Sequence, residues 1–351
     1  MPVLDSIDRG DFEQVQVLRS PGAGLTAVIA VHDTRMGPAF GGIRRRRYAD
    51  LGQALEDALR LARAMTLKCA IANIPAGGGK AVILDREELD RRAAYGLLGR
   101  HVEAMGGRFY TGPDLGTSDE DLLAVAEQTG FVARPGARGP GDLAESTALG
   151  VLSSLRATAA FLGRDLPGLV VAVQGLGAVG MKLSRMLADE GASLLVSDLM
   201  PERVDSAASE CGARPVPVGE ILDVSCDVLA PCALGGVITE EVAERLPARA
   251  ICGAANNLLA SPEAGRILHR RGVPAAPDFV ANAGALIHGA LFHLTGEVPP
   301  RSRIAGLGAV VAGILEESAA SGVPPGEVAL NRAKKVLGGY PPRPWFPERT
   351  P

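Results

Sequence analysis

Residues 170–198, with the sequence VVAVQGLGAVGMKLSRMLADEGASLLVSD, constrain the fold more than any other part of the chain. An apolar run predicts a buried strand, which leads into the pattern Gly175-x-Gly177-x-x-Gly180 at the start of a helix. A second apolar run then ends at Asp198. A strand, a glycine-rich turn, a helix and a second strand ending in an acid are typical of a dinucleotide-binding βαβ unit.

Each part of this motif has a chemical purpose in binding a pyrophosphate. We expect Gly175 to make the tight turn and Gly177 to let the backbone approach the phosphates. Gly180 lets the helix pack closely on the sheet. The helix N-terminus, at Ala178 and Val179, offers N–H groups and a positive dipole to the phosphates. The alternative is a tight strand-to-helix turn that binds no ligand.

The acidic residue at the end of the second strand indicates which dinucleotide binds. Asp198 follows the last glycine of the motif by 18 residues (198 − 180). A carboxylate there can accept hydrogen bonds from the adenosine ribose, and its charge would repel a 2′-phosphate. We therefore expect NAD rather than NADP as the cofactor, although Arg203 lies nearby in the sequence.

The order of the expected elements indicates an α/β fold in two halves. Beyond residue 141, apolar strands alternate with helices, which is typical of a parallel, doubly wound sheet. Its elements are expected at 145–163 and from Ala178 (helices), and at 169–173, 193–198, 227–231, 250–254 and 276–280 (strands). The first half is expected to hold strands at 12–32, 80–84 and 108–112, a glycine-rich turn at 76–79, and helices at 52–68, 86–105 and 118–129. Residues 131–143, rich in Pro, Gly and Arg, predict a linker between the halves.

Composition and charge exclude several classes of protein. Apolar residues make up 47% of the 351 residues, which excludes a disordered or fibrous chain. The net charge is −4, and one Trp and four Tyr offer few stacking platforms, so we expect no nucleic-acid partner. We expect no apolar stretch of the roughly 20 residues that a membrane helix needs. The acidic first residues do not match a signal peptide, so no membrane partner and a cytoplasmic location are expected.

Cysteine and histidine patterns give no sign of a disulfide framework or a metal site. The five cysteines are odd in number and form no C-x-x-C pair, which favours free thiols in a reducing compartment. The five histidines include no H-E-x-x-H, and His288 and His293 lack neighbouring acids or cysteines. We therefore expect no bound metal.

A second group of candidate residues lies in the first half of the chain. Lys68 ends an amphipathic helix, three residues beyond Met65 on its core-facing stripe. Lys80 follows three glycines, which would let the backbone pass close to a small ligand, and Asp114 ends a predicted strand. A lysine partly withdrawn from water has a lowered pKa and can act as a base near neutral pH, exchanging protons with a carboxylate.

These residues also have ordinary alternatives. Lys68 can simply complement a helix C-terminus, Lys80 can be solvated, and Asp114 can cap the next helix. The segment around Lys80 is not a phosphate-binding P-loop, because Ile74 and Ala81 occupy the places of its first glycine and of its Ser or Thr.

Together, these segments resemble the glutamate/leucine/phenylalanine/valine dehydrogenase family. The likeness spans residues 24–295 and rests on eight motifs in the family's order. They are HDTRMGPAFGG, ARAMTLK, GGGKAVI, TGPDLGT, GLGAVG, APCALGGVIT, GAANN and PDFVANAG. Chance agreement across eight such segments is implausible.

The resemblance implies NAD-dependent oxidative deamination of an L-amino acid to a 2-oxo acid and ammonia, and the reverse reaction. Lys68 resembles the lysine that binds the substrate carboxylate. Lys80 resembles the general base that activates water, and Asp114 resembles its proton-transfer partner. Such chemistry also needs a cleft that excludes water during hydride transfer.

Further positions match residues that border substrate or cofactor in the family. Those implied for the substrate are Gly41, Gly42, Met65, Gly112, Asn257, Asn282, Leu286 and Gly289. Those implied for the cofactor, besides the glycine motif and Asp198, are Thr147, Cys232, Ala233, Ala254 and Asn256.

The resemblance also implies the domain arrangement and the assembly. Residues 1–140 are expected to form an α/β substrate-binding and oligomerisation domain, completed by C-terminal helices at about 328–351. Residues 141–327 are expected to form the Rossmann domain, with the active site in the cleft between the two domains. The family further implies a homodimer or an octamer.

The apolar amino acid that serves as substrate is predicted from a few pocket positions. No cation is evident for a side-chain carboxylate, so glutamate is not expected. The motifs are closest to the phenylalanine dehydrogenase branch, and Gly112 stands where branched-chain members often carry Ala. Leucine, valine or an unusual bulky amino acid are the alternatives, since Ala285 departs from the family's N-A-G-G and Leu286 lies near Gly289.

Two further alternatives concern the protein as a whole and its run of arginines. A catalytically silent NAD-binding protein would keep the same fold, but the retained Lys68, Lys80, Asp114 and Asn257 argue against it. Residues 44–47 are four successive arginines. We expect them to form a solvated or subunit-interface strand edge. The alternative is a site for RNA or another anionic partner, which the overall negative charge disfavours.

Overall fold

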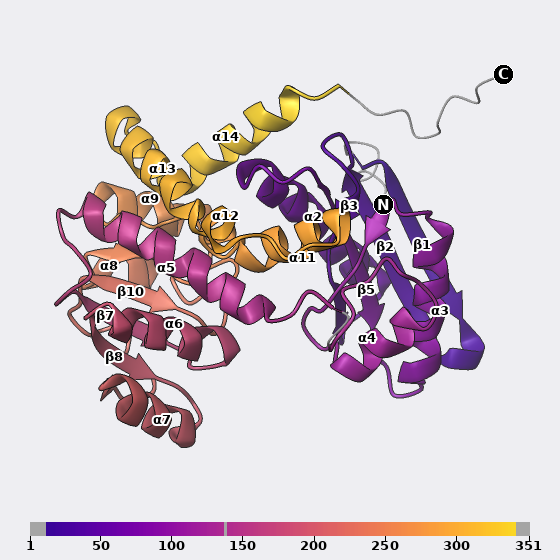
Figure 1. The fold of residues 1–351 in the computed structure, drawn as a ribbon, viewed down its shortest axis with the longest axis horizontal. Helices are drawn as coiled ribbons and strands as arrows, with labels where there is room; N and C mark the ends of the chain where they lie inside the picture. Colours follow the sequence, from indigo (N-terminus) through magenta and orange to yellow (C-terminus); the bar gives the residue numbers. More distant parts are fainter. Residues whose placement is uncertain (1–11, 137–138, 342–351) are drawn as a thin grey trace. The chain divides into compact units, whose positions relative to one another are not determined.

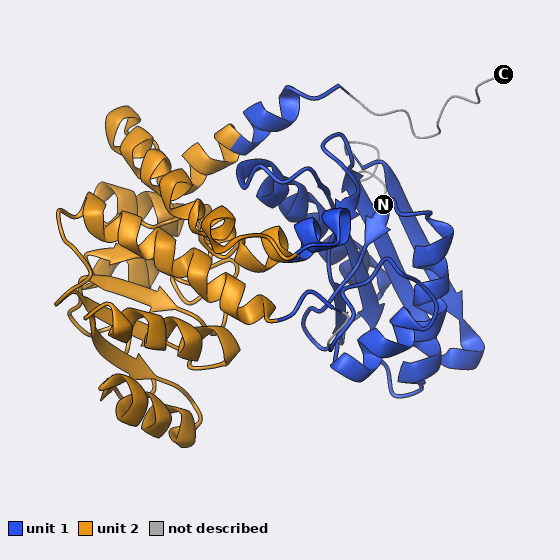
Figure 2. Ribbon diagram, in the orientation of Figure 1, with its two compact units in different colours: residues 1–141, 289–297, 333–351 blue, residues 142–288, 298–332 orange. Residues whose placement is uncertain are grey.

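Two units divide the computed structural model of the chain, which describes residues 12–136 and 139–341 (Figures 1 and 2). Unit 1 comprises residues 1–141, 289–297 and 333–351, and unit 2 comprises residues 142–288 and 298–332. The sequence did not indicate that residues 289–297 group with the first unit. The expected first domain at 1–140 and the expected C-terminal helices at about 328–351 each include residues outside the described ones, namely 1–11, 137–138 and 342–351.

Unit 1 is built on a six-stranded mixed sheet. Its strands are β1 (Gln14–Ser20), β2 (Leu25–Asp33), β3 (Ala39–Phe40), β4 (Ile43–Arg46), β5 (Gly77–Leu84) and β6 (Phe109–Tyr110). Their order is β1-β2-β5-β3-β6, with β4 also paired to β5. β1 and β2 are antiparallel, as are β2 and β5, whereas β3 and β4 both run parallel to β5. The short turn η1 (Pro21–Ala23) joins the first two strands.

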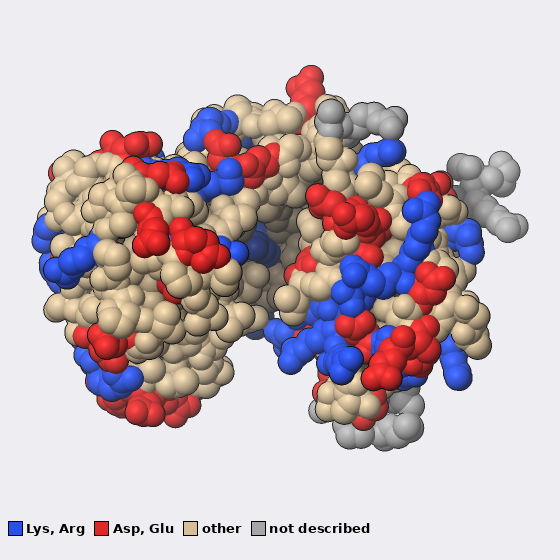
Figure 3. All heavy atoms as spheres, turned by 90° about the horizontal axis from the view of Figure 1, so that it is seen from below, with Lys and Arg blue, Asp and Glu red and all other residues tan. Residues whose placement is uncertain are grey.

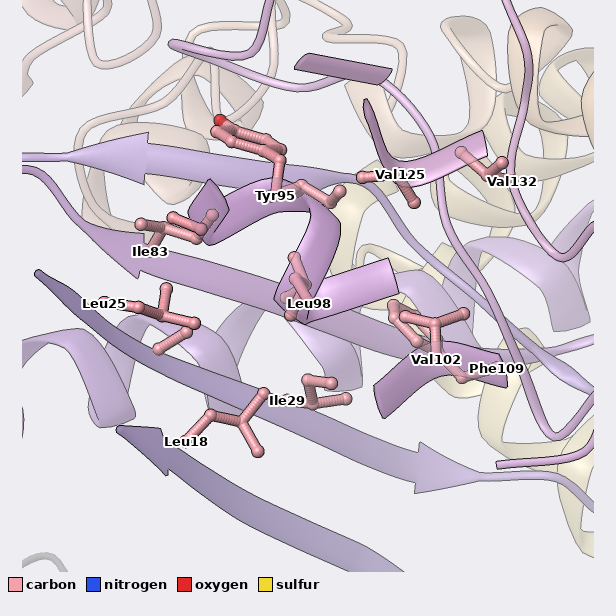
Figure 4. Close-up of a cluster of buried hydrophobic side chains, with 14 of the residues drawn as sticks. Leu18, Leu25, Ile29, Ile83, Tyr95, Leu98, Val102, Phe109, Val125 and Val132 are labelled. Atoms are coloured by element: carbon pink, nitrogen blue, oxygen red, sulfur yellow. The ribbon is translucent and has the colours of Figure 1, made fainter. Parts of the chain in front are cut away.

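Among the described residues, three helices cover the two faces of this sheet, and each begins at a side-chain cap. They are α2 (Leu51–Ile71), α3 (Arg91–Ala104) and α4 (Asp119–Ala126). Asp50 and Asp90 cap α2 and α3, and Ser118 forms a capping box with Asp121 at the start of α4. Alternate residues of β5 face opposite sides, so Val82 packs toward α2 while Ile83 packs in the cluster of α3 and α4 (Figure 4).

Two expectations for this unit were wrong. Residues 76–79 were expected to form a turn, but Gly77, Gly78 and Gly79 begin strand β5. The expected linker at 131–143 is shorter, because Val132 pairs with Thr111 and is buried in the core of unit 1. The run 12–32 is two strands separated by a tight turn, in which Gly24 has a φ of 60°.

Unit 2 holds a five-stranded sheet whose strands are all parallel. The strands are β7 (Val170–Gln174), β8 (Ser193–Ser197), β9 (Arg214–Pro215), β10 (Val228–Pro231) and β11 (Ala250–Ile251), in the order β11-β10-β7-β8-β9. This order reverses between β7 and β10, which is the point where ligands bind in doubly wound sheets. The predicted α/β fold with a Rossmann-type sheet is therefore confirmed. The strand expected at 276–280 is instead a single bridge at Ala275 followed by helix α10 (Asp278–Ala281).

The remaining helices are described by their bounds. Those of unit 2 are α5 (Leu143–Phe161), α6 (Ala178–Asp189), α7 (Pro201–Cys211), α8 (Glu240–Arg245), α9 (Pro262–Arg270), α10, α12 (Arg301–Ala305) and α13 (Leu307–Ser321). Helices α11 (Gly284–Thr295) and α14 (Pro325–Gly338) each contribute residues to both units. On the face shown in Figure 3, basic and acidic side chains are interspersed.

One stretch is longer and more apolar than the sequence analysis expected. The stretch Arg301–Ser321 contains 18 successive residues with a mean hydropathy of 1.3, and it could cross a membrane by length and composition alone. The core helix of a folded domain passes the same test. Here 39% of those 18 residues are buried, and α13 packs against α5, where a Cβ on Gly308 would lie 2.6 Å from the backbone oxygen of Ser153. One face of α13 is therefore covered by α5 within unit 2.

Candidate active site

Lys80 lies on strand β5 with its ammonium group beside a carboxylate. Its Nζ is 2.9 Å from Oδ2 of Asp114, which stands in the loop after β6. The alternation of β5 places Lys80 on the same side as Val82, toward α2. The side chain of Lys80 is only 7% exposed, whereas that of Asp114 is 21% exposed. The structure thus brings together the two residues that the family resemblance paired.

Burial and charge set the protonation of this pair. Burial lowers the pKa of Lys80, and Asp114 opposes that effect only in part, so the pKa of Lys80 stays below its ordinary value. Burial would raise the pKa of Asp114, but Lys80 and Arg44 outweigh it and hold that pKa below its usual range. The aspartate is therefore ionised, and the lysine releases its proton more easily than a solvated one.

Arg44 belongs to this cluster, which corrects the expectation that residues 44–47 are only a solvated or interface edge. Its side chain is 16% exposed. Its Nε lies 2.9 Å from Oδ2 of Asp114, and its Nη1 lies 3.2 Å from Oδ2 of Asp57 on α2. Strand alternation was the available signal, because Arg44 pairs with Val82, which faces α2.

The glycines near Lys80 bring protein segments close together rather than leaving space for a ligand. A Cβ on Gly78 would lie 2.1 Å from the amide nitrogen of Thr66 on α2. A Cβ on Gly41 would lie 1.7 Å from the oxygen of Gly79, and one on Gly42 would lie 2.4 Å from the oxygen of Pro113. The glycine run was expected to let the backbone pass close to a ligand, and this expectation was wrong. The glycines are required because strands, loop and helix pack closely against one another here.

Helix α2 carries the other predicted substrate residues of unit 1. Asp57, Leu61, Met65 and Lys68 follow one another at spacings of four, four and three, and all four are half-buried. This spacing places them on one stripe of the helix. Thr66 touches Gly78, two residues before Lys80, so Met65 and Lys68 flank a contact point between α2 and β5.

Gly112 lies between β6 and Asp114, and its surroundings bear on the substrate pocket. It is buried, and a Cβ there would meet one heavy atom of the described residues within 4 Å, the Cβ of Ala133 at 3.1 Å. Apart from the two chain neighbours of Gly112, no other heavy atom of those residues would lie within 4 Å of that Cβ.

In unit 2, the glycine-rich turn has the geometry that a pyrophosphate requires. Gly175 has a φ of 92°, and a Cβ there would lie 2.6 Å from the Cβ of Ala233. A Cβ on Gly180 would lie 1.9 Å from the oxygen of Gly175, so helix and strand pack closely. Gly177 caps α6 without a side chain, and the space where its Cβ would stand is open. The first N–H groups of α6, at Ala178 and Val179, therefore border a cradle that a dinucleotide phosphate fits.

Asp198 follows β8 and is fixed by backbone donors. Its Oδ2 accepts the N–H of Leu176 at 2.6 Å, and its Oδ1 accepts the N–H of Met200 at 2.9 Å. Burial would raise the pKa of Asp198, but these N–H groups and Arg203, at 3.6 Å, hold that pKa below its ordinary value. The motif and its acid are thus joined directly, with the charge kept on the carboxylate.

A second loop of unit 2 brings together three predicted residues. The side-chain Nδ2 of Asn282 donates to the backbone oxygen of Ala254 at 3.0 Å and to Oδ1 of Asn256 at 2.8 Å. Asn257 is held in the left-handed region with a φ of 53°. Its N–H donates to Oδ2 of Asp278, a residue that the sequence analysis did not identify.

The other predicted residues of unit 2 lie on its helices and at the end of β10. Thr147 is buried in the second turn of α5, where its hydroxyl donates to the oxygen of Leu143. Cys232 and Ala233 directly follow β10, and a Cβ on Gly180 would lie 3.2 Å from the Cβ of Cys232.

Helix α11 carries the two remaining pocket candidates. Leu286 and Gly289 are half-buried, and their spacing of three places them on one face of the helix. Ala285, the departure from the family pattern, is half-buried beside them. Within residues 12–136 and 139–341, no group of three or more His, Cys, Asp or Glu side chains could hold a metal ion.

Comparison with known proteins decides the family. Residues 13–130 match the family model described as Glu/Leu/Phe/Val dehydrogenase, dimerisation domain, and residues 200–292 match glutamate/leucine/phenylalanine/valine dehydrogenase. The chain belongs to this family. The predicted resemblance is therefore confirmed, and the protein is an amino-acid dehydrogenase, an oxidoreductase of a family that uses a nicotinamide cofactor.

Individual relatives include enzymes named for different substrates. The chain is 41% identical over 293 residues to the leucine dehydrogenase of Thermoactinomyces intermedius, covering 82% of this chain and 80% of that protein. It is 42% identical over 287 residues to the phenylalanine dehydrogenase of Caldalkalibacillus thermarum, covering 79% and 78%. Among solved structures, it is similar to L-tryptophan dehydrogenase from Nostoc punctiforme, with a TM-score of 0.83, 34% identity and coverage of 96% and 98%.

Proposed function

We propose that this dehydrogenase catalyses the NAD-dependent, reversible oxidative deamination of an apolar L-amino acid, with L-phenylalanine as its preferred substrate. The observation that carries the proposal is the buried Lys80 with its Nζ 2.9 Å from Asp114. Such a pair supplies what hydrolysis of an imine requires, a base that can take a proton from water and a carboxylate that can relay it.

In this proposal the residues around Lys80 bind the substrate and move its protons. Lys68 binds the carboxylate of the amino acid through its ammonium group, and Gly41, Gly42 and Met65 border the substrate. Neutral Lys80 takes a proton from the water that attacks the imine carbon, and then, as an ammonium group, faces the oxygen of the forming 2-oxo acid. Asp114 exchanges protons with Lys80, and ammonia leaves when the carbon–nitrogen bond breaks.

The residues of unit 2 are assigned to the cofactor and to the polar end of the substrate. A nicotinamide dinucleotide held by these residues would supply the acceptor for the hydride of the α-carbon in deamination, and the hydride donor in the reverse reaction. The N–H groups at Ala178 and Val179 bind the pyrophosphate, and Asp198 binds the ribose and disfavours a 2′-phosphate. Thr147 and Asn256 bind on the nicotinamide side, and Asn257 binds the substrate. Cys232, Ala233, Ala254 and Asn282 line or support this site.

The choice of phenylalanine rests on the pocket positions. Among the described residues, a Cβ on Gly112 would meet the Cβ of Ala133 at 3.1 Å and, chain neighbours aside, no other heavy atom within 4 Å, and Leu286 and Gly289 are half-buried on one face of α11. An apolar pocket discriminates only by about 1–3 kcal/mol per methylene, so we expect activity on several apolar amino acids. A branched-chain preference for leucine or valine is the second candidate, and the 41–42% identity to leucine dehydrogenases supports it equally.

We also propose that the enzyme is a homo-oligomer, a dimer or an octamer, in the cytoplasm. The match of residues 13–130 to a model described as a dimerisation domain supports self-association. Size-exclusion chromatography with light scattering tests it, and a monomeric mass would contradict it.

The substrate proposal is tested by NADH formation at alkaline pH with a panel of L-amino acids. The panel holds phenylalanine, tyrosine, tryptophan, leucine, valine and glutamate, and NADP replaces NAD in a control. The highest kcat/KM for phenylalanine with NAD supports the proposal. A preference for leucine or valine overturns the substrate assignment but keeps the reaction, and absence of turnover on every amino acid overturns the proposed function.

A further inference from the structure

Arg44 joins the Lys80–Asp114 pair to a second carboxylate. Its Nε and the Nζ of Lys80 both lie 2.9 Å from the same atom, Oδ2 of Asp114. Its Nη1 lies 3.2 Å from Oδ2 of Asp57. One guanidinium group therefore contacts an acid in the loop after β6 and an acid on α2, which a planar group with several fixed donors can do.

Asp57 is itself held by further side chains. Its Oδ2 accepts the hydroxyl of Tyr48 at 2.8 Å, and its Oδ1 contacts Nη2 of Arg60 at 2.7 Å. The side chain of Asp57 is 14% exposed. The contacts run without a gap from Lys80 through Asp114, Arg44 and Asp57 to Tyr48.

This order of contacts depends on three elements and a loop. Lys80 is on β5, Arg44 on the neighbouring β4, Asp57 on α2, and Asp114 after β6. The backbone of β4 is paired to β5 from Ile43 to Arg46, so the starting point of the Arg44 side chain is fixed by the sheet. The remaining freedom lies in its rotatable bonds, which the two carboxylates restrict from opposite ends.

We propose that Arg44, braced by Asp57 and Tyr48, is a positioning residue that holds Asp114 against Lys80 and sets the proton balance between them. The inference rests on the proposed function, in which Lys80 and Asp114 transfer protons. Arg44 acts through Asp114.

The charges around Lys80 determine in which direction the loss of Arg44 shifts the pKa of Lys80. Asp114, after β6, and Asp57, on α2, raise the pKa of Lys80, whereas Arg44, on β4, lowers it. Helix α2 also carries Lys68 and Arg60, whose positive charges act in the same direction as that of Arg44. Removing the charge of Arg44 therefore raises the pKa of Lys80. It also raises the pKa of Asp114, because Arg44 lowers it.

The test compares Arg44→Met with Arg47→Met, a matched loss of one arginine at an exposed position of the same run. The readout is the pH profile of kcat/KM for deamination, together with the Kd for NADH. In Arg44→Met, the rise of kcat/KM with pH shifts to a pH about one unit higher, because the pKa of Lys80 is raised. The kcat of this variant falls about 10- to 100-fold. Arg47→Met keeps the wild-type profile. Identical profiles and kcat for the two variants overturn the proposal.

Arg44→Lys distinguishes the effect of the positive charge from that of the simultaneous contact with Asp114 and Asp57. This variant is also informative if Arg44→Met does not fold. A lysine keeps the positive charge but cannot reach both carboxylates with a planar group. We expect its alkaline limb near the wild-type position, with kcat about tenfold lower. Tyr48→Phe, which removes one donor to Asp57, lowers kcat about threefold. Wild-type kcat in both variants overturns the positioning role.

Failure of this inference is distinguishable from failure of the proposed function. If Lys80→Ala abolishes turnover while Arg44→Met behaves as Arg47→Met does, the reaction stands and the role of Arg44 is wrong. If Lys80→Ala retains turnover, the proposed roles of Lys80 and Asp114 fail, and the role of Arg44 fails with them.

Discussion

Lys80 and Asp114 form an ion pair at 2.9 Å in which the lysine is almost fully buried and the aspartate is partly open to solvent. This asymmetry matters for proton transfer. Burial destabilises the charged form of Lys80 more than that of Asp114, because Lys80 is the more buried of the two. The neutral state is therefore favoured for the lysine rather than for the aspartate. The aspartate keeps its charge and a route to water.

Removing the amine of Lys80 should stop catalysis without affecting the cofactor. We expect Lys80→Ala to lower kcat by at least about 10²- to 10⁴-fold, the usual contribution of a general base. The Kd for NADH, measured by fluorescence titration, should stay within about twofold, since the glycine motif lies in the other unit. Lys334→Ala, at an exposed position of α14, is the control and should behave as the wild type. Turnover in Lys80→Ala near the wild-type rate would contradict the assignment.

Substitution of Asp114 should shift the pH profile in the opposite direction to substitution of Arg44. Asp114 raises the pKa of Lys80, so Asp114→Asn lowers it further. The rising limb of kcat/KM for deamination, which follows loss of the lysine proton, should then move to lower pH. The maximal rate should fall as well, because the carboxylate no longer exchanges protons. Profiles recorded from pH 6 to 11 check this, and an alkaline shift would show that the charge balance has been assigned wrongly.

The sequence predicted the dinucleotide unit well because its determinants are local. Gly175, Gly177 and Gly180 act within one strand-to-helix turn, and the spacing to Asp198 follows from one helix and one strand. The contact between Asp198 and the N–H of Leu176 is a consequence of that same short segment.

The site in unit 1 was harder to predict because its contacts join distant positions. The residues alone suggested that Asp114 could exchange protons with a partly buried lysine, and the family resemblance identified that lysine as Lys80. Arg44 was assigned to a solvated edge because four successive arginines show no alternation of polar and apolar residues. Such an alternation would have indicated which side chain of the strand is turned toward α2. The run Gly77–Gly79 was expected to be a turn, since nothing local shows that α2 and the neighbouring strands press against it.

Asp198 should control the choice between the two nicotinamide dinucleotides. Asp198→Asn removes the charge but keeps one oxygen for the N–H groups that the carboxylate accepts. We expect the Kd for NADH to rise about tenfold, from loss of a charge-assisted hydrogen bond of about 1.5 kcal/mol. The preference for NADH over NADPH should narrow, because the repulsion of a 2′-phosphate is gone. Asp205→Asn, at an exposed position of α7, is the control, and an unchanged NADH/NADPH ratio in Asp198→Asn would refute the assignment.

Asp278 should affect the substrate through the backbone of Asn257. Its carboxylate accepts the N–H groups of Asn257 and Leu258 and so holds Asn257 at a φ of 53°. This conformation costs an asparagine roughly 1 kcal/mol without such support. We expect Asp278→Asn to lower kcat/KM for the amino acid about tenfold while the Kd for NADH changes little. The exposed Asp189→Asn on α6 is the control, and equal kinetics in the two variants would exclude the role of Asp278.

Gly78 should be intolerant of even one added methyl group. A Cβ there would lie 2.1 Å from the amide nitrogen of Thr66 and 2.4 Å from the oxygen of Ala62, both backbone atoms of α2 that cannot turn aside. Gly78→Ala must therefore separate α2 from β5, and we expect the free energy of unfolding to fall by about 3 kcal/mol.

The matched control is Gly326→Ala in the first turn of α14, where the space for a Cβ is open. That variant should be neutral, or more stable by up to about 1 kcal/mol, because alanine favours the helix. Urea unfolding followed by circular dichroism measures both. Since Lys80 lies two residues along β5 from Gly78, and Lys68 lies two residues along α2 from Thr66, Gly78→Ala should also raise the KM for the amino acid. Equal stability of the two alanine variants would show that the close approach of α2 to β5 does not require a glycine at position 78.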